Sequence, residues 1–522
     1  MNPPAGQCVD GANIRLAPVA HPFQLFNTLT RKVENVEPLV PGQLTFYSCG
    51  PTVYSFAHIG NFRSFLTADL LVRTATALGY DVRYATNITD VGHLTEDDVT
   101  DATGEDRMAR ALRSREGQQF ANVWDLARYY ADELISDWKH LNLREPSVRP
   151  RATEHMREQI LAVQELLDRG HAYETKQGVY FSVASFPGYG SLSGNLDATT
   201  LEQSVRDVVS DPEKKDARDF ALWKKDDAHL MQWYSPWGWG FPGWHIECSV
   251  MAMQYLGDEI DIHAGGEDLI FPHHECERAQ SEALSGKPFA RYWVHTRFLQ
   301  VEGKKMSKRS GNFHTVRDLL ASLEKGGRGV DPLALRMTLL AGHYRKPYNF
   351  TFDTIRAHTR HRERLTEALR AVNMDPMDAA QGAGTSDPAS MGSFEPLYDR
   401  ALAAMSDDLN TPEALAVLFE GVKRILSASP GLSRDEQNQA AAWLHGMNRL
   451  LGVVYPEHEG AQEPSATQQD DTHIDELIEE RQKARAEKDF ARADAIRGEL
   501  TALNIEVMDS PDGVRWKRKT TF

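Results

Sequence analysis

Cysteine is scarce in this chain, with only four residues among 522. That number excludes a small scaffold stapled by disulfides and favours a reducing compartment. Long apolar runs are also missing, and since none approaches roughly 18 residues, no transmembrane helix or membrane partner is expected. The first 20 residues contain one Asp and one Arg, unlike a secretory or Arg-rich transit segment. We therefore expect a cytoplasmic protein in which residues 1–22 form a disordered extension.

An excess of basic charge is absent as well. Lysine and arginine number 58 against 75 aspartate and glutamate residues, so the net charge is −17. This argues against non-specific coating of nucleic acid but allows a local basic groove. Hydrophobic residues make up 41% of the chain and charged residues 25%, an ordinary globular composition that excludes a wholly disordered protein. The length predicts about three domains.

The pattern of apolar residues predicts an α/β fold. Residues 44–50 are typical of a strand, residues 58–79 of a helix and residues 81–88 of a second strand, which together form the building block of a parallel sheet. Another strand is expected over 259–263, followed by a Gly-rich turn and a helix from about Phe271. Residues 233–244 are dense in Trp, Gly and Pro, and we expect a loop there.

Two segments have the composition of linkers. Residues 373–393 and 457–472 are rich in Gly, Pro, Ser, Asp and Gln. Packed helices are expected between them. After the second linker, residues 474–503 favour a pair of charged helices, and the turn at 510–513 favours a hairpin.

A set of metal-binding residue types recurs in the first half of the chain. His273 and Glu277 are four residues apart, so they share one face of a helix, while Cys248 and Cys49 lie upstream. Zinc accepts thiolate, imidazole and carboxylate ligands. Taken singly, these residues have simpler explanations. A buried Cys usually acts as a small hydrophobic residue, and a His and a Glu four residues apart are usually an exposed polar pair on a helix. Cys276 would point away from the His273 face, and we expect it to be a bystander.

Nucleotide-binding signatures of the common kinds are missing, since there is neither a P-loop nor a G-x-G-x-x-G turn after a strand. Residues 58–61 (His-Ile-Gly-Asn) instead stand where the first strand meets the first helix, a place suited to a phosphate. The lysines of 303–312 form a flexible cationic loop that could neutralise a transferring phosphoryl group. Alone, the tetrad could be chance and the loop a solvated turn.

Six motifs in order carry a resemblance to a known family. They are CGPTVY at 49–54, the tetrad at 58–61, NITD at 87–90, GWHIECS at 243–249, HAGGEDLIFPHHE at 263–275 and KMSK at 305–308. From about Phe23 to Lys519 the chain resembles class I aminoacyl-tRNA synthetases, and within them the cysteine–tRNA ligases (cysteinyl-tRNA synthetases). The tetrad departs from the class pattern by ending in Asn61 instead of His, and the loop continues with Arg309 before Ser310. The motifs assign no role to residues 93–118.

The resemblance implies a domain plan. A Rossmann-type parallel-sheet catalytic domain with a zinc site would span 23–350 and carry an inserted segment at roughly 140–240. A helical bundle domain would follow over 351–456. After the linker at 457–472, a small α+β module at 473–522 would recognise the anticodon.

The resemblance also implies roles for individual positions. The zinc ligands would be Cys49, Cys248, His273 and Glu277. Catalysis and nucleotide binding would fall to His58, Asn61, Lys305 and Lys308, with Gly266 and Asp268 also binding the nucleotide. The substrate pocket would include Cys49, Gly50, Thr52, Thr89, Trp244 and Asp268. The anticodon would be read by Arg485, Asp494, Arg497 and Asp509.

The implied activity is ATP-dependent attachment of L-cysteine to tRNA(Cys) through a cysteinyl-adenylate. It would use ATP with Mg²⁺ and one Zn²⁺ per chain, and we expect a monomer. Two alternatives are a ligase that joins cysteine to an amino-sugar inositol in mycothiol synthesis and a non-catalytic RNA-binding paralogue. The module at 474–519 argues against the first, and the intact signature positions argue against the second.

Overall fold

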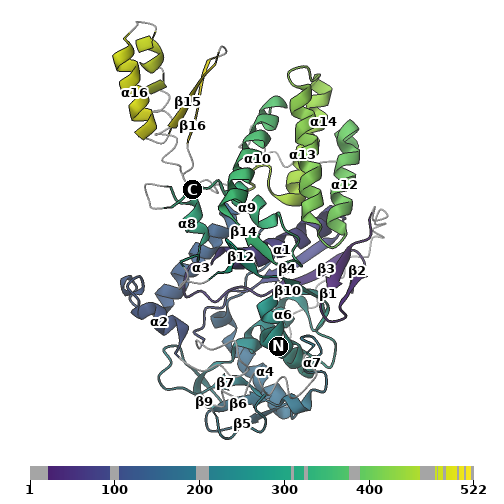
Figure 1. Cartoon of the computed structure of the whole chain (residues 1–522). Coiled ribbons are helices and arrows are strands. Elements are labelled where there is room, and N and C mark those ends of the chain that lie inside the picture. The colour runs from purple at the N-terminus through teal and green to yellow at the C-terminus, as the bar shows by residue number, and fades with distance from the viewer. Residues whose placement is uncertain are drawn as a thin grey trace, which may run out of the picture.

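The fold is taken from a computed structural model (Figure 1). It describes residues 21–93, 105–194, 211–306, 311–322, 327–374 and 388–458, and, near the C-terminus, 477–478, 480–485, 489–502, 505–510 and 513–518. The predictions for residues 1–20, for most of both linkers and for Lys308 lie outside the described residues. Among those described, no helix is both long and apolar enough to cross a membrane.

A four-stranded parallel sheet forms the centre of the first half, in the order β11-β10-β3-β4. The predicted strand–helix–strand unit is confirmed, because α1 joins the neighbouring strands β3 and β4. Gly79 follows α1 with φ +91°, a backbone that glycine adopts without strain. The sheet and this helix comprise β3 (Gln43–Ser48), α1 (Ile59–Ala77), β4 (Asp81–Thr86), β10 (Ile260–Gly266) and β11 (Ala290–Thr296), preceded by the hairpin β1 (Gln24–Asn27) and β2 (Lys32–Asn35).

Between β4 and β10 the chain forms a helical stretch and a second, antiparallel sheet, in the order β5-β6-β7-β9-β8. The helices of this stretch are α2 (Arg107–Arg113), α3 (Val123–His140) and α4 (Met156–Asp168). The strands of the sheet are β5 (Ala172–Glu174), β6 (Gly178–Phe181), β7 (Phe220–Lys224), β8 (Trp233–Ser235) and β9 (Gly238–Pro242). The loop predicted over 233–244 was wrong, since β8 and β9 make a hairpin there. Aromatic residues favour strands, and Gly238 (φ +105°) closes the turn.

The helix expected from about Phe271 begins later. After α6 (Trp244–Leu256) and β10, short turns occupy Glu267–Leu269 and Ile270–His274, and the regular helix α7 runs over Glu275–Ser285. Phe271 has extended dihedrals (φ −137°, ψ 132°). It precedes Pro272, and a residue before proline is sterically pushed out of the helical region. The prediction erred by about one turn.

A helical bundle packs on α1, on the side away from the antiparallel sheet (Figure 1). The packed helices predicted between the linkers are confirmed as α12, α13 and α14. The remaining elements of this half are β12 (Leu299–Val301), β13 (Lys304–Lys305), α8 (Val316–Leu320), α9 (Pro332–Leu340), β14 (Tyr348–Phe350), α10 (Phe352–Ala371), α12 (Glu395–Ser406), α13 (Thr411–Ala428) and α14 (Arg434–Leu451).

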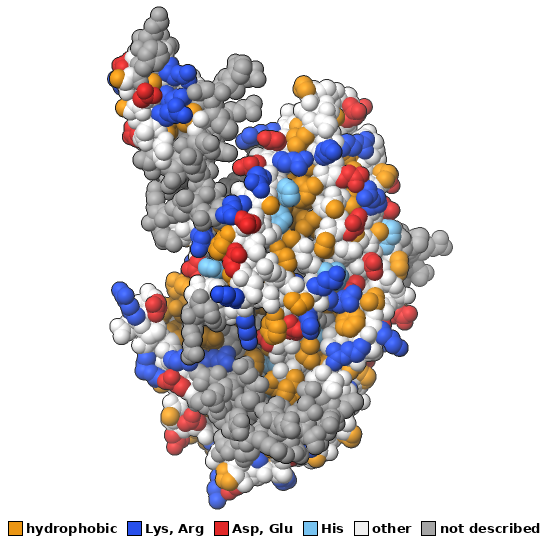
Figure 2. Space-filling model, in the orientation of Figure 1, with side chains coloured by type: hydrophobic (Ala, Val, Ile, Leu, Met, Phe, Trp, Pro, Cys, Tyr) orange, Lys and Arg blue, Asp and Glu red, His pale blue; other side chains and the backbone are white. Residues whose placement is uncertain are grey.

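The C-terminal unit combines α16 (Phe490–Ala502) with the antiparallel hairpin β15 (Ile505–Ser510) and β16 (Gly513–Arg518). Residues 477–478 and 480–485 are helical as well, so the predicted helices and hairpin are confirmed. A small apolar cluster that includes Ile478 and Leu500 holds the helices together. Figure 2 shows Lys and Arg side chains grouped on the visible face of this unit.

Candidate active site

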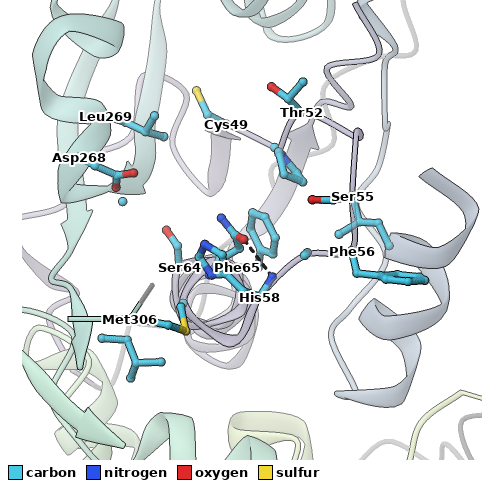
Figure 3. Close-up of a pocket in the computed structure, with 18 of the residues that line it drawn as sticks. Cys49, Thr52, Ser55, Phe56, His58, Ser64, Phe65, Asp268, Leu269 and Met306 are labelled. Atoms are coloured by element: carbon cyan, nitrogen blue, oxygen red, sulfur yellow. Dashed lines mark hydrogen bonds between the residues drawn. The ribbon is translucent and has the colours of Figure 1, made fainter. Parts of the chain in front are cut away.

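A cavity of about 580 Å³ lies where β3 and β10 end and α1 begins. In open parallel sheets, ligands bind outside these carboxyl ends of the strands. Figure 3 shows His58 at the N-terminal end of α1, with Cys49 and Asp268 across the cavity from it. The lining includes nine residues that the sequence singled out: Cys49, Gly50, Thr52, His58, Asn61, Trp244, Gly266, Asp268 and Lys305.

The start of α1 is fixed by a reciprocal pair of hydrogen bonds. His58 is the N-cap residue, and its Nδ1 accepts the backbone N–H of Asn61 at 3.1 Å. The side-chain Oδ1 of Asn61 accepts the backbone N–H of His58, also at 3.1 Å. Because Nδ1 is an acceptor, the neutral imidazole carries its proton on Nε2. The tetrad therefore places a ring donor at a helix N-terminus, where anions are stabilised.

The four predicted metal ligands lie together beside the cavity. One donor atom from each of Cys49, Cys248, His273 and Glu277 falls within 4.8 Å of the others, and all four side chains are buried. The Cys49 thiol donates to Glu277 Oε1 at 3.2 Å, and His273 Nε2 lies 3.0 Å from the same oxygen. Two sulfurs, one imidazole nitrogen and one carboxylate oxygen form a donor set that suits Zn²⁺.

The electrostatics of this cluster favour the charged forms of three of the four side chains, whereas burial, Cys248 and Glu277 raise the pKa of the Cys49 thiol well above its usual range. Burial alone would raise the pKa of Glu277, but His263 and His273 hold it well below its usual range. Burial opposes the charge of His273, yet Glu277 and Cys248 raise its pKa to about 10. Burial also opposes ionisation of Cys248, whereas hydrogen bonds with Cys49 and His273 lower its pKa. Glu277 and Cys248 are thus held toward their anionic forms, and binding of a metal would release the protons of Cys49 and His273.

A second combination shares two of these residues, namely Cys49, His263, His274 and Glu277. His263 Nε2 lies 2.9 Å from Glu277 Oε2, the oxygen that faces away from Cys49 and His273. His274 Nδ1 is engaged by His295 Nε2 at 2.7 Å. We favour the set with two thiols because thiolates are strong ligands of Zn²⁺. His263 then orients Glu277 from behind, as outer partners of metal ligands usually do.

Some predicted residues lie behind the cavity. Cys248, His273 and Glu277 do not line it, and the cluster borders it through Cys49 and through Trp244, whose ring packs 4.3 Å from that of His273. Thr89 is also absent from the lining and is fully buried. Its hydroxyl accepts a hydrogen bond from Asn87 at 3.0 Å, and its backbone pairs with that of Thr52.

Gly50 has a steric reason to be glycine. A Cβ there would lie 1.8 Å from the backbone oxygen of Asn87. The N–H of Gly50 donates to Asn87 Oδ1 at 2.8 Å, which draws the two segments together. The CGPTVY and NITD motifs therefore meet in space, and this contact shapes one wall of the cavity.

The sequence analysis missed several residues of the site. Arg107, in α2, lines the cavity and lies over the ring of Tyr54 at 5.9 Å. It belongs to residues 93–118, to which no sequence motif assigned a role. His263 and His274, which lie around the cluster, are part of the motif at 263–275. Because histidine is a common metal ligand, their residue type could have indicated a place near the metal site. His245 Nδ1 likewise lies 2.9 Å from His273 Nδ1.

The remaining predicted residues lie outside the cluster. Lys305 is exposed at the cavity, with Nζ 6.0 Å from the ring centroid of Phe298. In the C-terminal unit, Asp494 and Arg497 are exposed on α16, three residues apart and so on one helical face. Arg485 is exposed too. Asp509 lies in β15, but its side chain is outside what the structure describes.

Comparisons with solved structures agree with the fold. Methionyl-tRNA synthetase of Mycobacterium tuberculosis, in complex with methionyl-adenylate, superposes with a TM-score of 0.54 at 15% identity, covering 80% of this chain and 92% of that one. A leucyl-tRNA synthetase (LeuRS) ternary complex from Agrobacterium radiobacter K84 gives 0.53 at 10% identity, covering 80% and 85%. At such low identity these likenesses show the class I fold alone.

Sequence comparisons identify the family. Residues 35–360 match the model of the class I (C) tRNA synthetase catalytic domain, 402–455 the DALR domain and 471–516 the cysteinyl-tRNA ligase anticodon binding domain. Cysteine–tRNA ligase of Salinibacter ruber is 57% identical over 515 residues, covering 95% of this chain and 98% of that protein. The enzyme of Chlorobaculum tepidum is 41% identical over 508 residues, covering 95% and 99%. The chain therefore belongs to the cysteine–tRNA ligase family of class I aminoacyl-tRNA synthetases.

Proposed function

We propose that this enzyme attaches L-cysteine to tRNA(Cys) in two steps. The carboxylate of cysteine attacks the α-phosphorus of ATP, the bond to the bridging oxygen breaks, and pyrophosphate leaves with the electron pair. A ribose hydroxyl at the tRNA 3′ end then attacks the carbonyl carbon, and AMP leaves. The observation that carries the proposal is one cavity with His58 and Lys305 on one side and the Cys49 cluster on the other.

Displacement at phosphorus needs positioning and charge neutralisation more than covalent help. The Nε2–H of His58 and the N-terminus of α1 supply donors for phosphate oxygens, and Lys305 supplies a positive charge at the same cavity. Lys308, three residues after Lys305 in the sequence, adds a second charge, and Asn61 keeps His58 in place. Mg²⁺ bound with ATP would supply further positive charge against the phosphates. Gly266 and Asp268 line the opposite wall and bind the nucleoside or the amino acid.

Selectivity is the harder problem, because serine differs from cysteine only by oxygen in place of sulfur. A hydrophobic pocket discriminates such small differences by about 1–3 kcal/mol. A Zn²⁺ ion held by Cys49, Cys248, His273 and Glu277 would bind a thiolate far better than a hydroxyl. Cys49 and Trp244 bring the cluster to the cavity wall, so the amino-acid side chain would lie against them. Gly50 and Thr52 line that end, and Thr89 supports it from behind by pairing with Thr52.

The C-terminal unit is proposed to read the anticodon. Unpaired bases are recognised by stacking and by hydrogen bonds to their edges. Arg485 and Arg497 offer donors and Asp494 and Asp509 offer acceptors for such edges. The domains follow the same proposal: 23–350 catalytic with an insertion at roughly 140–240, 351–456 the bundle, and 473–522 the anticodon unit. We propose that the protein is a monomer and that it is cytoplasmic; the free cysteines of the described chain are in keeping with a reducing compartment.

The decisive experiment measures transfer of labelled cysteine to unfractionated tRNA, with ATP and Mg²⁺, beside cysteine-dependent ATP–pyrophosphate exchange. Both activities are expected from zinc-replete protein. Exchange without tRNA charging would mean another acceptor, such as the amino-sugar inositol of the mycothiol ligase. Loss of both would indicate a non-catalytic RNA-binding relative.

A further inference from the structure

The two most exposed large aromatic side chains of the described residues stand side by side. Tyr234 is 70% exposed and Trp239 is 60% exposed. They face each other across the β8–β9 hairpin, with ring centroids 5.8 Å apart and an interplanar angle of 67°. β8 is an edge strand of the antiparallel sheet. The pair therefore presents two rigid rings to solvent.

The opposite face of the same hairpin is also aromatic. Trp233 meets Trp124, at the start of α3, in an edge-to-face contact with centroids 5.6 Å apart. Trp124 is itself 42% exposed. The aromatic pair of Tyr234 and Trp239 thus stands on a hairpin that is braced from behind by a second pair of rings.

The hairpin leads directly into the cavity wall. Trp244, which lines the cavity, is the fifth residue after Trp239, so an extended strand would place them at most about 17 Å apart. His229 fixes this approach, because its ring stacks on Phe241 at 3.8 Å and its Nε2 lies 3.0 Å from the carbonyl of Gly92. The aromatic pair therefore lies within one short strand of Trp244 in the cavity wall.

Positive charge accompanies the aromatic rings. α2 packs on α3 and has the sequence RMARALR, with three arginines and no acidic residue. Arg107 reaches the cavity, Arg110 is exposed, and Arg113 pairs with Glu105. α3 links this basic helix to the hairpin, because α2 packs on α3 and Trp124 of α3 contacts Trp233. In a chain of net charge −17, these elements supply the two features that bind single-stranded RNA, namely a cationic track and stacking surfaces.

We propose that Tyr234 and Trp239 form a stacking platform for the unpaired 3′ nucleotides of tRNA, with α2 contacting their phosphates. The platform guides the terminal ribose toward the cavity, and it rests on the proposed tRNA-charging function. Base stacking on an aromatic side chain contributes about 1–3 kcal/mol per base, without strong sequence preference. These residues position the acceptor and take no part in forming the adenylate.

The test uses full-length Trp239→Ala and Tyr234→Ala. Each is expected to raise the KM for tRNA by about 5–150-fold, the equivalent of one lost stack. Cysteine-dependent ATP–pyrophosphate exchange should keep its wild-type rate, which shows that the cavity is intact. Trp239→Phe should recover most of the loss because it restores a ring. Leu161→Ala, at a 55% exposed residue of α4, is the matched control and should charge tRNA normally.

A second measurement separates the 3′ end from the rest of the tRNA. A tRNA trimmed of its unpaired 3′ nucleotides serves as an inhibitor of charging, and it should inhibit the wild-type and Trp239→Ala proteins equally. Intact tRNA, in contrast, should bind the variant more weakly than the wild type. Wild-type KM values in both alanine variants would overturn the platform, as would equal weakening of trimmed tRNA. A change of sedimentation in the alanine variants would also overturn it, by assigning the hairpin to a second copy of this chain. Failure of the wild-type enzyme to charge tRNA would instead count against the proposed function.

Discussion

His58 and Asn61 hold one another at the first turn of α1 through two reciprocal hydrogen bonds of 3.1 Å. The position that carries histidine in the class pattern therefore acts here through an amide oxygen. The amide oxygen of Asn61 can accept the backbone N–H of the N-cap residue as well as an imidazole nitrogen can. The departure at Asn61 preserves the geometry of His58.

Asn61→Ala removes the acceptor for the His58 N–H and loosens the imidazole. We expect the rate of ATP–pyrophosphate exchange to fall by roughly 10–100-fold, because a misplaced group costs about that much. Asn61→Asp keeps an acceptor oxygen, so the helix start should stay capped, but it adds negative charge beside the phosphates. A larger rise in the KM for ATP is expected for aspartate than for alanine. Steady-state exchange at varied ATP decides, and wild-type rates in both variants would contradict this role.

His273→Ala removes the imidazole from the metal cluster. If zinc holds the substrate sulfur, the KM for cysteine should rise at least tenfold, about 1.4 kcal/mol, while the KM for ATP changes little. Exchange kinetics at varied cysteine and varied ATP give both constants, and elemental analysis gives the zinc content. Equal effects on the two substrates would falsify a selectivity role.

Cys276→Ser is the matched control for this experiment. Cys276 is as buried as the cluster cysteines, but it contacts Tyr189, with Sγ 3.4 Å from the hydroxyl, and belongs to neither possible ligand set. The serine variant should retain one zinc per chain and a normal KM for cysteine. Loss of zinc from this variant would mean that packing around α7, and not ligation, sets the metal content.

His263→Gln tests the outer layer. His263 Nε2 holds the Glu277 oxygen that faces away from Cys49, and its ring stacks on Trp293 at 4.6 Å. Loss of such an outer partner typically weakens metal binding by 10–100-fold. Competition with a zinc chelator should show a drop of that size. Unchanged zinc affinity would favour another orientation for Glu277.

The sequence was most informative where a local pattern determined the structure. The β3–α1–β4 unit and the C-terminal hairpin follow from apolar periodicity and turn residues, and both were predicted correctly. The meeting of Cys49 with Glu277 rests on contacts 228 residues apart, which no local pattern contains, and only the family motifs brought them together. Arg107 was missed because its segment looks like polar surface until α2 is seen against the cavity.

Composition also misled in one place. Residues 233–244 contain two prolines and three glycines, which favour a loop, yet the tertiary setting makes most of them a hairpin. β9 pairs with β7, where Trp223 lies opposite Pro242 and Lys224 opposite Phe241. The pairing of the strands therefore outweighs the local preference of Gly and Pro for a loop. The same override explains why the aromatic rings of the hairpin end up side by side.

The buried charges at the junction of α1 and α9 lead to the last prediction. Asp69 Oδ2 accepts from Arg73 Nε at 2.8 Å and from Arg336, and all three side chains are fully buried. Asp69→Asn leaves two guanidinium groups without this counter-charge. Removing one partner of a buried ion pair costs about 3–5 kcal/mol, so the free energy of unfolding should fall by that amount at pH 7.

The pH dependence of that difference identifies its cause. Burial alone would raise the pKa of Asp69, but Arg73 and Arg336 lower it from 3.8 to about 2. A carboxylate whose folded pKa is depressed contributes stability that is complete above its unfolded pKa and is lost as the pH falls through the folded pKa. The gap between wild type and Asp69→Asn in urea unfolding, followed by circular dichroism, should therefore be constant from pH 7 to about 5 and shrink between pH 4 and 2. A gap of the same size at pH 2 would mean that the variant suffers from altered shape or hydrogen bonding and not from the lost charge.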